Sequence, residues 1–203
     1  MSAPVAVLDY GSGNIRSAVR ALERTGARVE LTSDPQRAAA AAGLVVPGVG
    51  AFASVMDGLR AGGAVDVIRE RHAAGRPLLG ICVGLQVLFA SGSEHGVTSA
   101  GIGLWAGEVT RLHAPVIPHM GWDTVAPPVD SAMFAGIGDE RFYFVHSYAA
   151  HTAPAGARTT TTVHGEPFVA AVEDGSTWAT QFHPEKSGDA GAQLLANWVK
   201  ALD

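Results

Sequence analysis

Hydrophobic and polar positions follow two alternating periods in the first half of the chain. Short apolar runs typical of buried parallel strands occupy Val5–Leu8, 27–31, 43–46 and 77–81. Between them apolar residues recur at helical spacing, as in Ile15, Ala18, Val19 and Leu22, and again after Cys82 in Leu85, Leu88 and Phe89. Repeated strand–helix units predict a parallel sheet with helices on both faces.

The second half has a different pattern, in which short strands alternate with Gly/Pro turns. Strands are predicted at 109–112, 122–125, 142–145, 159–163, 169–172 and 178–182, followed by a helix over 191–202. No linker or repeat divides the chain. We therefore expect one domain over residues 1–203, of α/β class, with an open, mostly parallel or mixed sheet flanked by helices.

Composition narrows the function classes. The chain has 203 residues, of which 47% are hydrophobic and 16% charged, and this balance favours a filled core over disorder. A net charge of −5 gives no general attraction to nucleic acid or anionic membranes. The single cysteine rules out an intrachain disulfide and any metal site built from several cysteines. With no signal-like or membrane-length apolar segment, we expect a cytoplasmic protein.

The segment Gly80-Ile81-Cys82-Val83-Gly84 stands where a predicted strand meets a predicted helix. Small residues around a central nucleophile permit the tight turn of a nucleophile elbow, which exposes the central side chain. A following helix would aim N–H groups and its dipole at the sulfur and favour the thiolate. A lone cysteine is more often a buried core residue, but two glycines at this junction favour a nucleophile.

A thiolate nucleophile needs a base, and eight histidines compete for this role. Five lie among small or polar residues and are interpreted as surface residues: His72, His95, His113, His151 and His164. Two more, His119 and His146, have no carboxylate within two residues to orient them. His183 ends an apolar run, and Glu185 would share its face of an extended chain. This pair is the predicted base and its orienting carboxylate, although His-Pro-Glu alone is equally consistent with an ordinary turn.

The segment Pro47-Gly48-Val49-Gly50 follows another predicted strand. Its glycines allow the backbone to turn N–H groups toward an anion. Alone it indicates only a strand-to-helix turn. Beside an elbow, Gly48 and Val49 are candidates for one half of an oxyanion hole, and the N–H of Val83 for the other half.

These segments together resemble the class I, triad-type glutamine amidotransferases, and among them the glutaminase subunits of imidazole glycerol phosphate synthase. The resemblance covers nearly the whole chain. It includes the segments already quoted, with Ala51-Phe52 and Leu85-Gln86 continuing them, and four others: 9–15 (Asp-Tyr-Gly-Ser-Gly-Asn-Ile), 118–122 (Pro-His-Met-Gly-Trp), 143–148 (Tyr-Phe-Val-His-Ser-Tyr) and 181–187 (Gln-Phe-His-Pro-Glu-Lys-Ser). One departure is Asp123, where the family pattern usually has Asn.

The resemblance implies a flavodoxin-like fold and hydrolysis of glutamine to glutamate and ammonia, without cofactor or metal. Cys82 would be the nucleophile, His183 the base and then the acid, and Glu185 its orienting group. Glutamine binding would fall to Gly50, Gln86, Ser147 and Tyr148.

The resemblance also implies a partner, a (β/α)8-barrel cyclase subunit that forms a heterodimer with this chain. The cyclase would use the ammonia to make imidazole glycerol phosphate and an aminoimidazole carboxamide ribonucleotide in histidine biosynthesis. The interface would include Asn14, Trp122, Tyr143 and Lys186, although core packing is an equal explanation for Trp122 and Tyr143.

Three alternatives remain open from the sequence alone. One is another class I glutaminase, serving anthranilate, purine or pyridoxal phosphate synthesis. The second is a free-standing cysteine hydrolase on a related fold, and the third is a degenerate subunit that only docks. The intact triad argues against the third.

Overall fold

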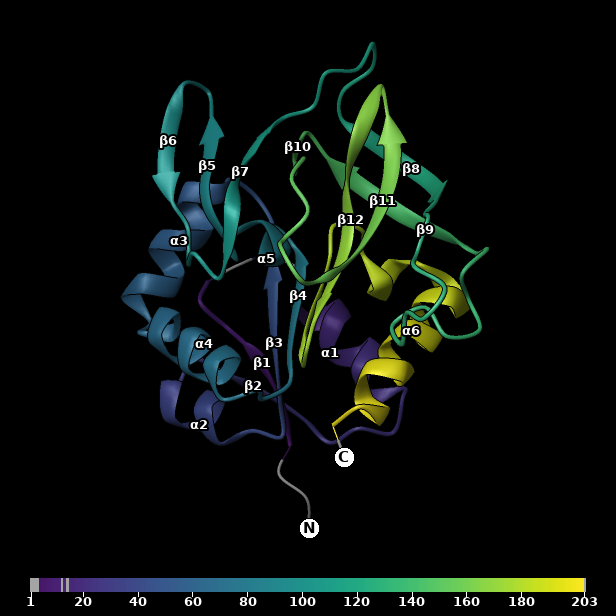
Figure 1. The fold of residues 1–203 in the computed structure, drawn as a ribbon. Helices are drawn as coiled ribbons and strands as arrows, with labels where there is room; N and C mark the ends of the chain where they lie inside the picture. Colours follow the sequence, from purple (N-terminus) through teal and green to yellow (C-terminus); the bar gives the residue numbers. More distant parts are fainter. Residues whose placement is uncertain (1–3, 12, 14, 203) are drawn as a thin grey trace.

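A computed structural model describes residues 4–11, 13 and 15–202 (Figure 1). Within these residues, seven strands form the main sheet, in the spatial order β11 (Arg158–His164), β12 (Glu166–Asp174), β13 (Thr177–Thr180), β4 (Leu78–Cys82), β3 (Gly43–Gly48), β1 (Val5–Leu8) and β2 (Val29–Thr32). The five strands from β13 to β2 are parallel to one another. At one side β12 pairs antiparallel with β13, and β11 pairs antiparallel with β12, so β11 runs in the same direction as the five. The predicted α/β class with a mixed sheet is confirmed.

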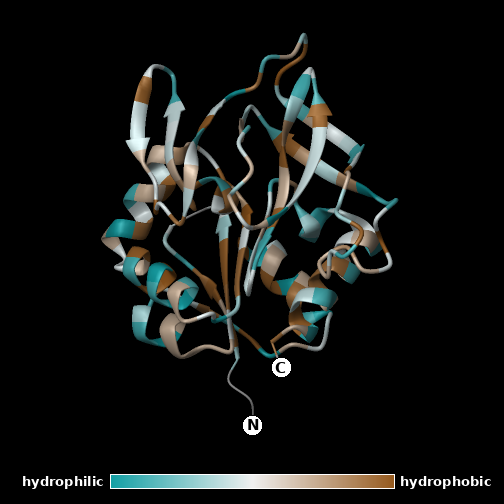
Figure 2. Cartoon of the chain, in the orientation of Figure 1, coloured by the Kyte–Doolittle hydropathy of each residue, from teal (hydrophilic) through white to brown (hydrophobic). Residues whose placement is uncertain are grey.

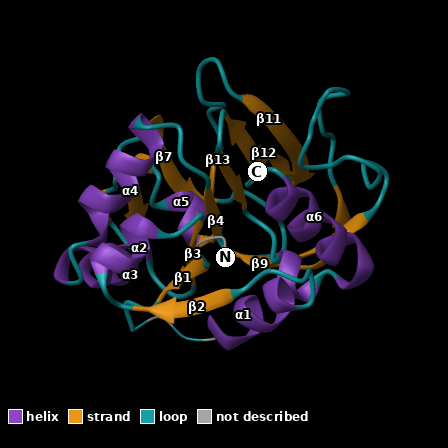
Figure 3. Ribbon diagram, turned by 90° about the horizontal axis from the view of Figure 1, so that it is seen from below, coloured by secondary structure: helices purple, strands orange, loops and turns teal. Residues whose placement is uncertain are grey.

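Helices cover both faces of this sheet (Figure 3). One face carries α2 (Pro35–Ala40), α3 (Phe52–Ala61) and α4 (Ala64–Ala73), and the other carries α1 (Ile15–Glu23) and α6 (Gly188–Lys200). Every residue of β1, β3 and β4 is buried. The central strands are accordingly apolar along their length, while polar residues mark the outer helix faces (Figure 2). The layers arise from the continuous apolar runs noted in the sequence.

Two smaller sheets lie beyond the carboxyl ends of the central parallel strands (Figure 1). One has the order β10 (Tyr148–Ala150), β7 (Trp105–Arg111), β5 (Phe89–Glu94) and β6 (Val97–Ala100). The other pairs β8 (His119–Thr124) with β9 (Arg141–His146). These sheets cover the edge of the main sheet where sites assemble in open α/β folds.

The helix predicted after Cys82 is wrong in length. Helix α5 (Val83–Gln86) has only one turn, and Phe89, expected on its apolar face, begins strand β5 instead. The backbone N–H groups of Ile102 and Leu104 donate to the carbonyls of Val87 and Leu88, so the chain leaves the helix to pair with a later segment. Strands β5, β6 and β10 were not predicted.

Candidate active site

The end of β4 forms a strained elbow. Cys82 has φ 56° and ψ −111°, a conformation rarely adopted by a residue with a side chain. The turn brings backbones so close that only glycine fits: a Cβ on Gly84 would lie 1.9 Å from the carbonyl oxygen of Val46, and one on Gly80 2.7 Å from that of Gly84. Backbone strain of this kind is concentrated at functional sites.

The expected helix-dipole contribution at Cys82 is reduced, because α5 has four residues. What surrounds the sulfur instead is a set of side chains from the other end of the sequence. Gln181 is fully buried, and its Nε2 lies 3.7 Å from Cys82 Sγ. Gln181 was not among the predicted site residues, although its position on an apolar run, two residues before His183, could have indicated it.

His183 and Glu185 meet three and five residues after β13. His183 Nδ1 lies 2.8 Å from Glu185 Oε1, and the two side chains are 3% and 5% exposed. The extended conformation assumed from the sequence is wrong, since Pro184–Lys186 forms a 3₁₀ turn. This turn nevertheless brings the carboxylate back to the imidazole.

The charge state of His183 follows from its neighbours. Burial, the largest single influence on its pKa, favours the neutral ring. Hydrogen bonds with Cys82 and Glu185, and the negative charges of both, outweigh burial and raise the pKa of His183 to about 9. The surroundings therefore favour an imidazolium beside the sulfur.

A cavity of about 260 Å³ opens onto Cys82 and His183. Most of the predicted site residues line it: Val49, Gly50, Cys82, Val83, Gln86, Ser147, Tyr148, His183 and Lys186. Val145, His146 and Glu94 complete the lining, and none of these three was predicted. Glu185 stands outside the lining and contacts His183. The cavity thus presents a thiol, two imidazoles, one carboxylate and one ammonium group.

The segment after β3 approaches the elbow closely. Gly48 is the last residue of β3 and pairs with Cys82 across the sheet. A Cβ on Gly48 would lie 2.5 Å from the backbone nitrogen of Gly84. The left-handed residue here is Gly50, with φ 92°, and its Cβ position is open. The loop therefore lies against the turn that carries the nucleophile.

Comparison with known proteins identifies the family. The model of the glutamine amidotransferase class-I family matches residues 6–202. The chain belongs to the class-I glutamine amidotransferases. It is 60% identical to the imidazole glycerol phosphate synthase subunit HisH of Thermobifida fusca over the whole of both chains. Its identity to the subunit of the same name from Streptomyces coelicolor is 56%, over 98% of this chain and 93% of the relative.

Solved structures agree on the fold. A crystal structure of a glutamine amidotransferase superimposes with a TM-score of 0.74 at 22% identity, covering 95% of this chain and 98% of that one. The structure of PurLQS from Thermotoga maritima gives 0.74 at 19% identity over the whole of both chains. At these identities the likeness concerns the fold alone.

Three of the four predicted interface residues of this amidotransferase lie next to one another. The ring of Trp122, which is 52% exposed, meets that of Tyr143 edge-on at 6.1 Å. The ammonium of Lys186 lies 5.9 Å from the centre of the Tyr143 ring. The fourth residue, Asn14, lies outside the described residues.

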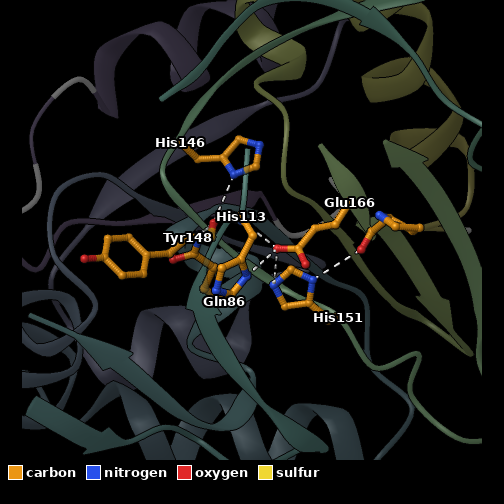
Figure 4. Close-up of polar contacts among 7 residues, drawn as sticks. Gln86, His113, His146, Tyr148, His151 and Glu166 are labelled. Atoms are coloured by element: carbon orange, nitrogen blue, oxygen red, sulfur yellow. Dashed lines mark hydrogen bonds and ion pairs between the residues drawn. The ribbon is translucent and has the colours of Figure 1, made fainter. Parts of the chain in front are cut away.

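His119 and His146, which were assigned no role from the sequence, are buried in the amidotransferase fold. His146 and Gln86 both bond the carbonyl oxygen of Tyr148, at 3.0 and 2.8 Å (Figure 4). His146 in turn contacts His119. His164, interpreted as a surface residue, stacks on His119 with ring centres 4.2 Å apart and is only partly exposed. His113 and His151 form a separate pair beside Glu166 (Figure 4).

The described part of the chain contains no group of three or more His, Cys, Asp or Glu side chains that could hold a metal ion. It also contains no helix long and apolar enough to cross a membrane.

Proposed function

We propose that this chain is the glutaminase subunit of an imidazole glycerol phosphate synthase and hydrolyses glutamine with Cys82, His183 and Glu185. The single observation that carries this proposal is the strained elbow at Cys82 beside the buried His183–Glu185 pair, opening onto one cavity. The full-length similarity to HisH subunits supports the assignment of substrate.

The proposed reaction has two halves. The thiolate of Cys82 attacks the side-chain amide carbon of glutamine, and the imidazolium of His183 gives its proton to the departing nitrogen, which leaves as ammonia. Neutral His183 then takes a proton from water, whose oxygen attacks the γ-glutamyl thioester. The C–S bond breaks, glutamate leaves, and the proton on His183 restores the starting pair. Glu185 orients the ring throughout and stabilises its charged form.

The tetrahedral intermediates carry a negative oxygen that needs donors. We assign this role to the N–H of Val83, directly after the nucleophile, and to the Gly48–Val49 segment. Support comes from the close approach of Gly48 to the elbow backbone. Losing one such donor costs on the order of 10²–10³ in rate.

The rest of the cavity is assigned to the amino-acid end of glutamine. Free glutamine carries an ammonium and a carboxylate, and the lining supplies the opposite charges in Glu94 and Lys186. Gln86, Ser147, Tyr148 and Gly50 surround the same space. We therefore add Glu94 to the glutamine-binding residues, as the acceptor for the substrate ammonium.

The relatives are named as subunits of a synthase, and we propose that this chain also works with a partner. The partner would be a (β/α)8-barrel cyclase subunit, joined as a heterodimer in the cytoplasm, that uses the ammonia in histidine biosynthesis. Asn14, Trp122, Tyr143 and Lys186 would lie at the interface. Support comes from the exposed Trp122 and Met120, which give β8 an apolar surface. We treat residues 1–203 as one amidotransferase domain.

The test is glutamine hydrolysis by the co-purified complex of this chain with its partner. The wild-type complex is expected to release one ammonia per glutamate, and Cys82→Ala to release none while still co-purifying. Substantial ammonia release by the Cys82→Ala complex would refute the assignment of the nucleophile. Co-purification with a protein that is not a cyclase would refute the assignment of the partner.

A further inference from the structure

A line of hydrogen-bonding groups leads from the cavity wall to the protein surface. His146 Nδ1 lies 3.0 Å from the carbonyl oxygen of Tyr148. His146 Nε2 lies 3.2 Å from Nδ1 of His119, its cross-strand partner in β8. His119 Nε2 lies 3.3 Å from Oδ2 of Asp123. Two imidazoles therefore connect two oxygen acceptors through three contacts.

These three contacts need three protons. A carbonyl and an ionised carboxylate only accept hydrogen bonds, so each end of the line requires an N–H from the adjacent ring. Two neutral imidazoles carry two protons in all. One contact must then bring two lone pairs together, unless one ring binds an additional proton.

The additional proton belongs on His119. Burial is the largest influence on the pKa of His146 and lowers it to about 3, so this ring stays neutral. The pKa of His119 is also lowered, first by burial and then by the charge of His164, while Asp123 acts in the opposite direction. His119 therefore gains its second proton on the acid side of the usual imidazole range.

The groups around His119 come from four strands. Asp123 faces it from β8, His146 from β9 and the stacked His164 from β11. The ring of Phe144 of β9 also stacks on the His119 ring, with ring centres 4.6 Å apart, and Phe168 of β12 meets the His119 ring edge-on. The rings fix the plane of His119, so its two nitrogens can serve only the two contacts described.

The carboxylate of Asp123 and the carbonyl oxygen of Tyr148 compete for the two protons of neutral His119 and His146. A charged carboxylate is a stronger acceptor than a carbonyl. The carboxylate therefore favours the tautomer in which Nε2 of each ring carries the proton. In this tautomer Nδ1 of His146 has no proton, and its lone pair faces the carbonyl oxygen of Tyr148. Tyr148 lines the cavity, so this competition loosens one wall of the glutamine site.

We propose that His119 is a positioning residue for glutamine binding, acting through His146 on the Tyr148 carbonyl, and that proton uptake by His119 tightens this wall. The inference rests on the proposed function, since it takes the cavity to bind glutamine.

An amide at position 123 would remove the competition. Asp123 Oδ1 already accepts from the N–H of Thr124 at 2.8 Å. In Asp123→Asn the amide oxygen keeps this bond, and the amide nitrogen takes the place of Oδ2 and donates to His119 Nε2. The two protons of neutral His119 and His146 then suffice for the other two contacts, whatever the pH.

The experiment measures kcat and KM for glutamine hydrolysis by the co-purified complex between about pH 5 and pH 8, the range in which imidazoles titrate. In the wild type, KM should fall as the pH is lowered, by about three- to tenfold, the equivalent of one net hydrogen bond. In Asp123→Asn, KM should stay at the low value across the range. His119→Phe keeps the ring stacking but loses both contacts, so its KM should stay high, with a smaller effect on kcat. The exposed His113, changed to Asn, is the control and should follow the wild type.

A second readout does not depend on activity. Nitrogen NMR of the full chain, labelled with ¹⁵N in its histidine rings, reports which nitrogen of His146 carries the proton. Near neutral pH we expect Nε2–H in the wild type and Nδ1–H in Asp123→Asn. The same tautomer in both proteins, or equal pH profiles of KM, would overturn the proposal. A wild-type complex that does not hydrolyse glutamine would instead overturn the proposed function, and the NMR result would still decide the proton arrangement.

Discussion

At the scale of single residues, the elbow requires glycines because there is no room for a Cβ atom at these positions. A Cβ on Gly84 would lie 1.9 Å from the Val46 carbonyl oxygen, and both groups are backbone, so neither can turn aside. We predict that Gly84→Ala destabilises the chain by about 3 kcal/mol or more, as overpacking and backbone strain do at their upper range. Urea unfolding of the purified chain measures this loss.

The matched control is Gly138→Ala. Its Cβ would meet its nearest neighbour, Pro127 Cγ, at 3.6 Å, an ordinary contact distance. The control should change stability by no more than about 0.5 kcal/mol. Equal stability of the two variants would show that the close approach at the elbow does not constrain the fold.

Glu94 supports a prediction about substrate binding. If its carboxylate accepts from the substrate ammonium, Glu94→Gln should raise KM for glutamine by about tenfold or more, the range for a hydrogen bond to a charged group. The rate constant kcat should change much less, because the contact is remote from the amide. Steady-state kinetics of the complex separates the two constants. A loss confined to kcat would place Glu94 outside the substrate contacts.

His183 supports a prediction about pH. Its pKa is raised to about 9, so the charged His183 ring persists above neutral pH and is lost as the pH rises through that value. Activity of the complex should therefore fall on the alkaline side near pH 9. Glu185→Gln removes one of the charges that raise the pKa of His183, so the alkaline fall should move to lower pH. An unshifted fall, in pH–rate profiles of both proteins, would contradict the role given to Glu185.

The nucleophile and its base were predictable because their signals are local. Cys82 lies between two glycines at a strand–helix boundary, and His183 is followed closely by Glu185. Glu94 and His146 were missed because their places depend on long-range pairing. Glu94 lies on a strand that pairs with β6 and β7, and His146 is placed by its partner in β8.

At the scale of elements, the apolar spacing after Cys82 was interpreted as a helix and is mostly not one. Leu85, Leu88 and Phe89 satisfy the helical period, but Phe89 belongs to β5. Residues 87–94 form hydrogen bonds with β7 and with the 101–104 segment instead of continuing the helix, and a local apolar pattern cannot predict such pairing. By contrast, β1, β3 and β4 were predicted well, since a strand buried on both faces is apolar throughout.

Arg71 joins elements that the sequence leaves unconnected. Its side chain is 2% exposed, and its guanidinium donates to the carbonyl oxygens of Ala38, Ala39, Ala41, Ala42 and Pro77 at 2.9–3.2 Å. It thereby ties α4 to the end of α2 and to the segments that begin β3 and β4. Burial, with a smaller contribution from Arg76, lowers the pKa of Arg71 to about 10, so the side chain remains charged at neutral pH.

We predict that Arg71→Met costs about 3–5 kcal/mol of stability, because five carbonyl groups lose a charged donor. Those of Ala39 and Ala41 keep a bond from Arg76, and that of Pro77 keeps one from the N–H of Leu44, whereas those of Ala38 and Ala42 lose the Arg71 donor without such a replacement. Arg71→Lys should cost less stability than Arg71→Met, because it keeps the positive charge. It should still cost some, because an ammonium lacks the planar guanidinium that reaches the carbonyl groups of both Ala42 and Pro77. Arg20, which is exposed on α1, is the control, and Arg20→Met should cost about 0.5 kcal/mol or less. Urea unfolding that found Arg71→Met as stable as the control would refute the role of this side chain.

At the scale of the whole molecule, the cavity exists only when both halves of the chain are folded together. The first half supplies Val49 and Cys82 from the ends of β3 and β4. The second half supplies the 145–148 segment and His183. The class of the fold followed from the first half alone, but the cavity wall required the small sheets that cover the strand ends. Function is therefore tested on the complete chain, in complex with its partner.

The most direct test of the central claim is the site of labelling by a glutamine analogue that alkylates thiols. Intact-mass and peptide-mass analysis of the complex should find one label per chain, on Cys82, the single cysteine of the sequence. Excess glutamine should protect the thiol, ammonia release should stop in proportion to labelling, and Cys82→Ser should take up no label. Full ammonia release by a chain quantitatively labelled at Cys82 would contradict the claim that this thiol attacks glutamine.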